Sequence, residues 1–179
     1  VLAQGTTVLE NAALEPDVTA LGEALVACGA QIDGLGSRRL TIRGVSALRP
    51  MDTAIIADRI EAATFAAAAA MTGGRIRLLG VMAEHFEAAL RKLEETGCTV
   101  ERGAGVVSVS GPARPAAVNV VTQPFPGFPT DMQAQVIAVC SIAGGTSVIE
   151  DTIYLDRFTH VPELARSALP DVILMDNNM

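Results

Sequence analysis

Two residues with reactive polar side chains, Thr130 and Asp131, follow a proline-rich segment at 123–129. The prolines stiffen a loop, and the apolar run after it predicts a helix over 130–143 that begins with this pair. Free N–H groups and the positive end of the helix dipole suit such a position to an anion or a polar ligand. The same residue types also fit a structural role, in which Thr130 caps the helix and Asp131 complements its dipole.

A second polar segment begins with two adjacent carboxylates, Glu150 and Asp151, at the predicted end of a strand. The loop beyond this strand carries Arg157. A guanidinium holds phosphate or carboxylate groups well, so Arg157 is a candidate ligand-binding residue. The alternative is a salt bridge from Arg157 to Asp156 or Asp131.

Charged residues also stand at two other predicted helix starts. His160 fits the beginning of a helix better than it fits a catalytic role. Asp58 and Arg59 open a helix in the position that is equivalent to 130–133, so they are candidates for the same site. Asp58 with Glu61 fits a plain capping box equally well.

The elements that must position these residues recur along the chain. Gly5, Gly73 and Gly145 mark the same point in three copies of one pattern, and each is followed by a short apolar strand and an amphipathic helix. The patterns predict strands at 7–9, 54–56, 75–81, 98–102, 106–110, 118–121, 147–149 and 172–175, and helices beginning near Val18 and over 58–71, 84–96, 130–143 and 161–168.

Two of these helices differ from the rest. The helices at 58–71 and 130–143 are apolar nearly all round after their first turns, so they must be covered on all sides. Both begin with capping-box patterns, Asp58 with Glu61 and Thr130 with Gln133. We therefore expect an α/β fold in which apolar helices lie at the centre and sheets lie outside them.

The composition of the chain argues against several classes of function. Half of the 179 residues are hydrophobic, and the formal net charge of −7 argues against a general nucleic-acid binder. No apolar run approaches the roughly 20 residues of a membrane span. Three cysteines without a C-x-x-C pair favour a reducing cytoplasm and disfavour a zinc site.

The repeat also predicts that the chain is a piece of something longer. Only the tail of the 58–71 type of helix precedes Gly5, as residues 1–4. At the other end, a predicted strand at 172–175 leads into a turn at 176–178 without its partner strand.

These segments together resemble the UDP-N-acetylglucosamine 1-carboxyvinyltransferase family, which has the EPSP synthase-like fold. The resemblance runs nearly end to end, weakens after Leu164, and is most specific in its third segment. The matching segments are Glu10-Asn11-Ala12-Ala13 with Glu15-Pro16, Asp58-Arg59-Ile60-Glu61, Phe128-Pro129-Thr130-Asp131-Met132-Gln133-Ala134-Gln135, and Arg157-Phe158 with His160-Val161-Pro162-Glu163-Leu164.

The resemblance implies an inside-out, barrel-like α/β assembly of βαβαββ units with buried central helices. It implies transfer of the enolpyruvyl group of phosphoenolpyruvate to the 3-hydroxyl of UDP-N-acetylglucosamine, without a cofactor or metal. Asp131 would be the base at the sugar hydroxyl. The candidate substrate-binding residues are then Ile153, through its backbone, and Arg157, Thr130, Asp58 and Arg59.

Residues 1–50 would close the family's first domain, and 51–179 would open the second with one complete and one incomplete unit. Alternatively, the three copies pack as a single domain. The family's cysteine-bearing loop, its Lys-Asn pair and most of its phosphoenolpyruvate-binding arginines match nothing in this sequence. Leu14 stands where the family commonly has Arg, and Leu155 where it has an acidic residue.

These departures leave three hypotheses open. The chain is a fragment or one part of an active transferase, a non-catalytic module that associates with itself, or an isolated nucleotide-sugar binder. A homodimer or a companion chain that completes the domains is compatible with the first two.

Overall fold

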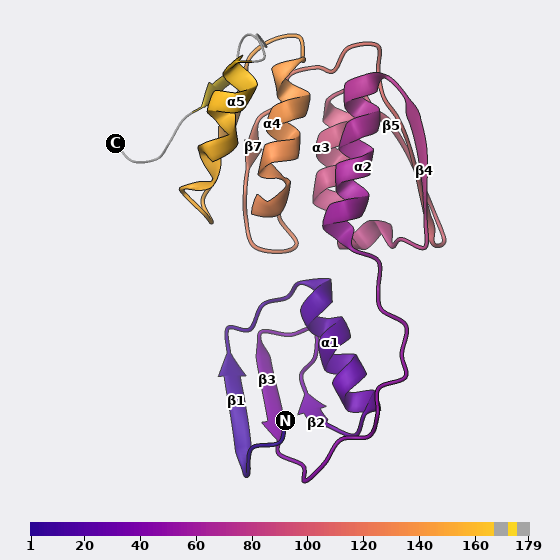
Figure 1. The fold of residues 1–179 in the computed structure, drawn as a ribbon, viewed down its shortest axis with the longest axis vertical. Helices are drawn as coiled ribbons and strands as arrows, with labels where there is room; N and C mark the ends of the chain where they lie inside the picture. Colours follow the sequence, from indigo (N-terminus) through magenta and orange to yellow (C-terminus); the bar gives the residue numbers. More distant parts are fainter. Residues whose placement is uncertain (167–171, 175–179) are drawn as a thin grey trace. The chain divides into compact units, whose positions relative to one another are not determined.

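The computed structural model describes residues 1–166 and 172–174. The chain divides into two compact units, Val1–Ile56 and Ala57–Met179. Each unit combines at least one helix with at least one small sheet (Figure 1).

The first unit is a three-stranded antiparallel sheet with one helix. Its elements are β1 (Thr6–Glu10), α1 (Pro16–Ala27), β2 (Gln31–Asp33) and β3 (Arg39–Arg43), with strand order β1-β3-β2. Helix α1 begins at Pro16, where the missing N–H costs nothing, and the chain leaves it through Gly29 at φ +104°. The buried apolar residues of this unit are few, namely Cys28, Ala30 and Leu40.

The second unit contains two sheets and the remaining helices. Its first part comprises α2 (Arg59–Thr72), β4 (Arg75–Leu79), the 3₁₀ turn η1 (Ala83–His85), α3 (Glu87–Glu95), β5 (Thr99–Gly103) and β6 (Val106–Ser110). Its second part comprises β7 (Val120–Val121), η2 (Thr130–Met132), α4 (Gln133–Ser141), β8 (Ser147–Glu150), η3 (Arg157–His160), α5 (Val161–Arg166) and β9 (Val172–Leu174). The strand orders are β4-β6-β5, antiparallel throughout, and β7-β8-β9, parallel throughout.

Three helices of the second unit, α2, α3 and α4, pack against its sheets. Helices α2 and α3 pack on the β4-β6-β5 sheet, α4 packs on β8 and β9, and α2 contacts α4 (Figure 1). Small side chains allow this close approach, since Ala63, Ala66 and Ala70 of α2 are completely buried. A Cβ atom added at Gly111, just after β6, would lie 2.1 Å from the Ala69 carbonyl oxygen.

The barrel-like assembly is not confirmed, and two other expectations about this core need correction. No closed sheet joins the strands of the described residues, because each sheet has three strands and two edges. Residues 54–56 do not form the predicted strand; Ile55 is 91% exposed and these residues pair with no strand, at the division between the units. Helix α2 is covered on most sides only, since Phe65 is 50% exposed and Ala68 and Met71 are exposed beside it.

The other predicted elements are present with shifted ends. The predicted helix at 84–96 is η1 followed by α3, and the predicted helix at 130–143 is η2 followed by α4. The helix predicted at 161–168 extends over Val161–Arg166, and the strand at 172–175 over Val172–Leu174. The rest of both, and the predicted turn at 176–178, lie outside the described residues.

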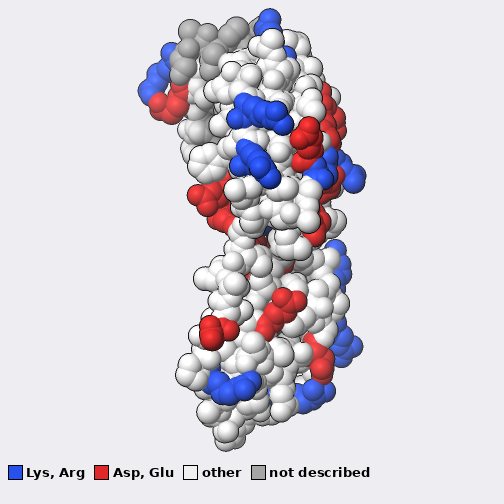
Figure 2. All heavy atoms as spheres, turned by 90° about the vertical axis from the view of Figure 1, so that its right-hand side faces the viewer, with Lys and Arg blue, Asp and Glu red and all other residues white. Residues whose placement is uncertain are grey.

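Charges of both signs alternate on the surface of the second unit. Arg102 lies 2.9 Å from Glu87 and 2.8 Å from Glu94, and Arg75 lies 3.6 Å from Glu101. The face drawn in Figure 2 likewise shows basic and acidic side chains close together rather than a field of one sign.

Candidate functional site

The proline-rich loop at 123–129 is closed by its own backbone hydrogen bonds. The amide of Gln123 donates to the Phe128 carbonyl at 2.9 Å, and the amide of Gly127 donates to the Pro124 carbonyl at 2.9 Å. A Cβ at Gly127 would lie 2.5 Å from the Cβ of Gln123, so the loop leaves room only for glycine there. This tight loop delivers Thr130 and Asp131 into the 3₁₀ turn η2, directly before α4.

The capping role suggested for Thr130 is wrong. No side chain caps η2 or α4, and the Thr130 hydroxyl donates instead to Asp151 Oδ2 at 2.7 Å. Gln133 does not complete a capping box either. Its side chain is wholly buried, and both its Oε1 and Nε2 atoms lack a hydrogen-bond partner within the described part of the chain.

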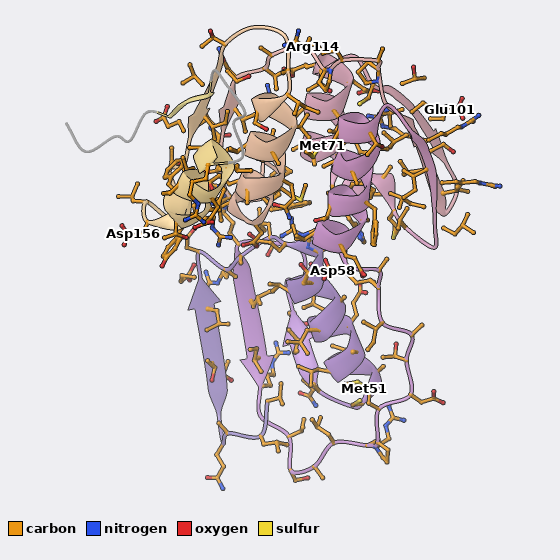
Figure 3. All side chains as sticks on the ribbon, turned by 45° about the horizontal axis from the view of Figure 1, so that its top comes forward. Met51, Asp58, Met71, Glu101, Arg114 and Asp156 are labelled. Atoms are coloured by element: carbon orange, nitrogen blue, oxygen red, sulfur yellow. The ribbon has the colours of Figure 1, made fainter. Side chains whose placement is uncertain are left out.

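Asp131 and Arg157 come from different predicted segments and meet in the structure. An Arg157 Nη2 atom lies 2.9 Å from Asp131 Oδ1, with the Asp131 side chain 51% exposed. The guanidinium also lies 5.5 Å from the centroid of the Tyr154 ring, which is within range of a cation–π contact. Of the two salt bridges predicted for Arg157, the one to Asp131 is therefore formed, and solvent can still reach the Asp131 carboxylate. Asp156, the other candidate, lies at the outer margin of its loop (Figure 3).

Asp151 is a further functional candidate, which in the sequence is only one of two adjacent carboxylates at a strand end. Its side chain is only 3% exposed, and its oxygens accept hydrogen bonds from Thr122, Thr130 and the amides of Ile153 and Tyr154. Burial by itself raises the pKa of this carboxyl, but the hydrogen bonds outweigh it and the pKa is lowered. The pair Glu150-Asp151 at a strand end was the available signal, although the sequence could not show which carboxylate is buried.

Ile153 belongs to the same turn. Its amide donates to Asp151 Oδ1 at 2.9 Å, and its side chain is exposed. Because the amide is occupied, a ligand that contacts the backbone of Ile153 would meet its carbonyl oxygen.

Asp58 stands at the start of α2 (Figure 3). Arg59 follows it as the first residue of this helix. Asp58 is the N-cap, since its Oδ1 accepts hydrogen bonds from Ile60 at 2.8 Å and Glu61 at 3.1 Å. Arg59 is nearly buried, and its guanidinium carbon lies 5.8 Å from the centroid of the Phe125 ring. Arg59 thus contacts the proline-rich loop, whereas the Asp58 side chain is engaged by its own helix.

Helices α2 and α4 are joined near these residues by polar contacts. Gln135 Nε2 donates to Thr64 Oγ1 at 2.9 Å, and the Thr64 hydroxyl donates to the Ile60 carbonyl at 2.8 Å. The N-terminal halves of the two helices are therefore linked to each other. A separate surface groove of about 430 Å³ lies between α3 and the loop, lined by Val121, Phe128 and Arg91 among others; it includes none of the predicted site residues.

Two further observations concern residues 1–166 and 172–174. Within them, no helix combines the length and the hydrophobicity needed to cross a membrane. The same residues contain no group of three His, Cys, Asp or Glu side chains placed to hold a metal ion.

Known proteins resemble the chain over nearly its whole length. It is 48% identical over 166 residues to the UDP-N-acetylglucosamine 1-carboxyvinyltransferase of Myxococcus xanthus, a match that covers 93% of this chain and 40% of that protein. The enzyme of the same name from Geobacter metallireducens is 48% identical over 165 residues, covering 92% and 40%. The chain thus spans about 40% of the length of the curated relatives it matches.

A solved structure and a family model agree with these relatives. The crystal structure of the enolpyruvyl transferase NikO from Streptomyces tendae superposes with a TM-score of 0.80 at 28% identity, covering 92% of this chain and 40% of that one. The family model described as EPSP synthase (3-phosphoshikimate 1-carboxyvinyltransferase) matches residues 1–169. The chain belongs to the EPSP synthase family of enolpyruvyl transferases.

Proposed function

We propose that the chain forms the part of a UDP-N-acetylglucosamine 1-carboxyvinyltransferase that carries the base for the sugar hydroxyl. The reaction moves the enolpyruvyl group of phosphoenolpyruvate to the 3-hydroxyl of UDP-N-acetylglucosamine and releases phosphate. It belongs to peptidoglycan precursor synthesis, in the cytoplasm. The identity of 48% to proteins that carry this name supports UDP-N-acetylglucosamine as the substrate, rather than the 3-phosphoshikimate that the family model names.

The observation that carries this proposal is the pairing of Asp131 with Arg157 at 2.9 Å. Because the ion pair uses Oδ1 of Asp131, the other carboxylate oxygen, Oδ2, can face a hydroxyl group of the substrate. Asp131 then accepts the hydroxyl proton as the sugar oxygen attacks phosphoenolpyruvate. Arg157 orients this carboxylate and adds positive charge where anionic substrates bind.

The remaining site residues act in binding. Ile153 contacts the nucleotide-sugar through its carbonyl oxygen, and Thr130 fixes the turn that bears Asp131. Arg59 supports the proline-rich loop through Phe125, to which its guanidinium carbon lies at 5.8 Å. Asp58 contributes by fixing the start of α2.

We extend the proposal to the architecture. Residues 1–50 close one inside-out domain and residues 51–179 open another, each built from repeated βαβαββ units around buried helices. The exposed side of α2 at Phe65, Ala68 and Met71 supports a covering partner, since an all-apolar helix is unstable when one side faces water. A second copy or a companion segment of the transferase would supply that cover.

The full reaction needs more than this chain. Groups that neutralise phosphate and protonate the enolpyruvyl carbon each contribute factors of roughly 100 to 10,000. In the family these groups belong to segments that match nothing in this sequence. The chain alone is therefore expected to bind the nucleotide-sugar with little or no turnover.

Two measurements test this function. Isothermal titration of the chain with UDP-N-acetylglucosamine should give saturable binding, and Asp131→Asn should weaken it by about 10-fold, the value of one charge-assisted hydrogen bond. Asp156→Asn is the matched control, because Asp156 is an exposed aspartate in the neighbouring loop. Absence of binding, or equal affinities of the Asp131 and Asp156 variants, would contradict the proposal.

Phosphate release from phosphoenolpyruvate in the presence of the nucleotide-sugar separates the hypotheses further. Turnover by the purified chain would exclude a non-catalytic module. In another outcome, the chain alone binds without turnover, and turnover then appears when the complementary part of a relative is added. That result would support the hypothesis that the chain is one part of a transferase.

A further inference from the structure

The carboxylate of Asp151 gathers donors from three separate segments of the chain. Oδ1 accepts hydrogen bonds from the Thr122 hydroxyl at 2.8 Å and from the amides of Ile153 and Tyr154, each at 2.9 Å. Oδ2 accepts one from the Thr130 hydroxyl at 2.7 Å. A buried carboxylate is tolerated only when hydrogen bonds replace its hydration, and here four donors do so.

The segments that Asp151 joins are those that bear the candidate site. Thr130 directly precedes Asp131, and Tyr154 lies under the guanidinium of Arg157 at 5.5 Å. Both partners of the Asp131–Arg157 pair are thus tied through neighbouring residues to one buried carboxylate.

Further hydrogen bonds fix the residues that surround Asp151. Thr122 is completely buried at the end of β7, and its hydroxyl also accepts from the Thr152 amide at 3.0 Å. The Thr152 hydroxyl donates to the Thr122 carbonyl at 2.6 Å, and the Thr122 amide donates to the Glu150 carbonyl at 2.9 Å. The ends of β7 and β8 therefore form a rigid base for the turn at 151–154.

We propose that Asp151 is a positioning residue that holds Asp131 and the turn at Ile153 and Tyr154 in the geometry a nucleotide-sugar requires. The proposal rests on the proposed function for its ligand, but the positioning itself concerns residues of this chain alone. Asp151 does not touch the substrate, and it acts through the Thr130 hydroxyl and the two amides.

Single substitutions can separate this role from general stability. Thr130→Val removes one donor and keeps the shape of the side chain, whereas Thr130→Ser keeps the donor. Asp151→Asn keeps an oxygen for Thr122 and the amides but turns an NH₂ group toward Thr130. Asp156→Asn is the control for the loss of one negative charge nearby.

Two readouts are needed, one of them independent of ligand. In ¹⁵N-labelled protein, the amide resonances of Asp131, Ile153 and Tyr154 should move in Thr130→Val and Asp151→Asn and stay in place in Asp156→Asn. Titration with UDP-N-acetylglucosamine should show affinity lower by about 10-fold or more in both, with Thr130→Ser within about 3-fold of the original.

Each result has a definite meaning. If the spectra and the affinity of Thr130→Val match those of Asp156→Asn, the positioning role is wrong. This test does not depend on whether Asp151→Asn folds. If Thr130→Ser fails to restore what Thr130→Val loses, the hydroxyl link is not responsible and the proposal is overturned. If the original chain does not bind the nucleotide-sugar but the resonances move as expected, the proposed function fails and the positioning role stands.

Discussion

The guanidinium of Arg157 lies 2.9 Å from Asp131 Oδ1, although the two residues belong to different 3₁₀ turns, η3 and η2. Both side chains are partly open to water, with exposed fractions of 34% and 51%. Ion pairs in such surroundings contribute roughly 0–1 kcal/mol to folding, because solvent screens them. The consequence of this pair is therefore the direction of the Asp131 carboxylate rather than the stability of the unit.

Replacing Arg157 should accordingly separate binding from stability. We expect Arg157→Ala to change the free energy of unfolding by less than about 1 kcal/mol and to weaken binding of UDP-N-acetylglucosamine by about 10-fold. Urea denaturation and calorimetric titration measure the two effects. Arg166→Ala is the control, since Arg166 is an exposed arginine that pairs with Glu163 within α5. Equal loss of affinity in the two variants would show that total charge, not this pair, matters.

The capping-box pattern predicted a helix cap correctly at Asp58 but not at Thr130. Asp58 lies in an extended conformation at φ −68° and ψ 112°, from which its carboxylate reaches the first amides of α2. Thr130 and Gln133 show the same sequence pattern without forming a cap. The Thr130 hydroxyl is taken by Asp151, a partner from another segment, and nothing in the sequence near Thr130 announces that contact.

The same distinction explains the other differences between sequence and structure. Alternation and helical spacing located nearly every strand and helix, because burial of one face is a local signal. The segment at 54–56 has a strand-like composition, but a strand also needs a partner, and Ile55 is exposed at the end of the first unit without one. The sequence does not single out Asp151, because its burial and its four hydrogen-bond donors come together only in the folded chain.

Arg102 should make the second unit sensitive to acid. It hydrogen-bonds Glu87 and Glu94. Burial raises the pKa of Glu87, but bonds to Arg102 and Arg91 outweigh it, and the bond to Arg102 is the main cause of the lowered pKa of Glu94. Since both folded-state pKa values lie below the ordinary 4.5, the stabilisation is present above about pH 4.5 and is lost as the pH falls through them.

We therefore expect Arg102→Met to lower the free energy of unfolding by about 1 kcal/mol at pH 7, and by much less near pH 3. Urea denaturation at both pH values measures this. Arg75→Met is the control, because Arg75 makes one exposed pair with Glu101 at 3.6 Å. A loss at pH 3 as large as that at pH 7 would assign the effect of Arg102 to packing instead of charge.

The two units should differ in local stability. The first unit buries only Cys28, Ala30 and Leu40 as apolar residues, and every residue of β1 is exposed. The second unit holds the continuous apolar core around α2, α3 and α4. We expect amide protons of β3 to exchange at least about 100-fold faster than those of α2, as measured by NMR hydrogen exchange. Similar protection in both would mean that the first unit gains cover that its own residues do not provide.

Helix α2 offers an internal test of which alanines are packed. Ala70 is completely buried, whereas Ala68 lies on the exposed side with Phe65. Leucine has nearly the helix propensity of alanine, so the same substitution at both positions isolates packing. We expect Ala70→Leu to cost about 1–3 kcal/mol of unfolding free energy in urea denaturation, through overpacking against neighbours that cannot move apart. Ala68→Leu should change it by less than about 0.5 kcal/mol. Should Ala68→Leu be as costly as Ala70→Leu, and should the original chain behave as a dimer on a sizing column, the exposed side of α2 would have to be an interface between copies.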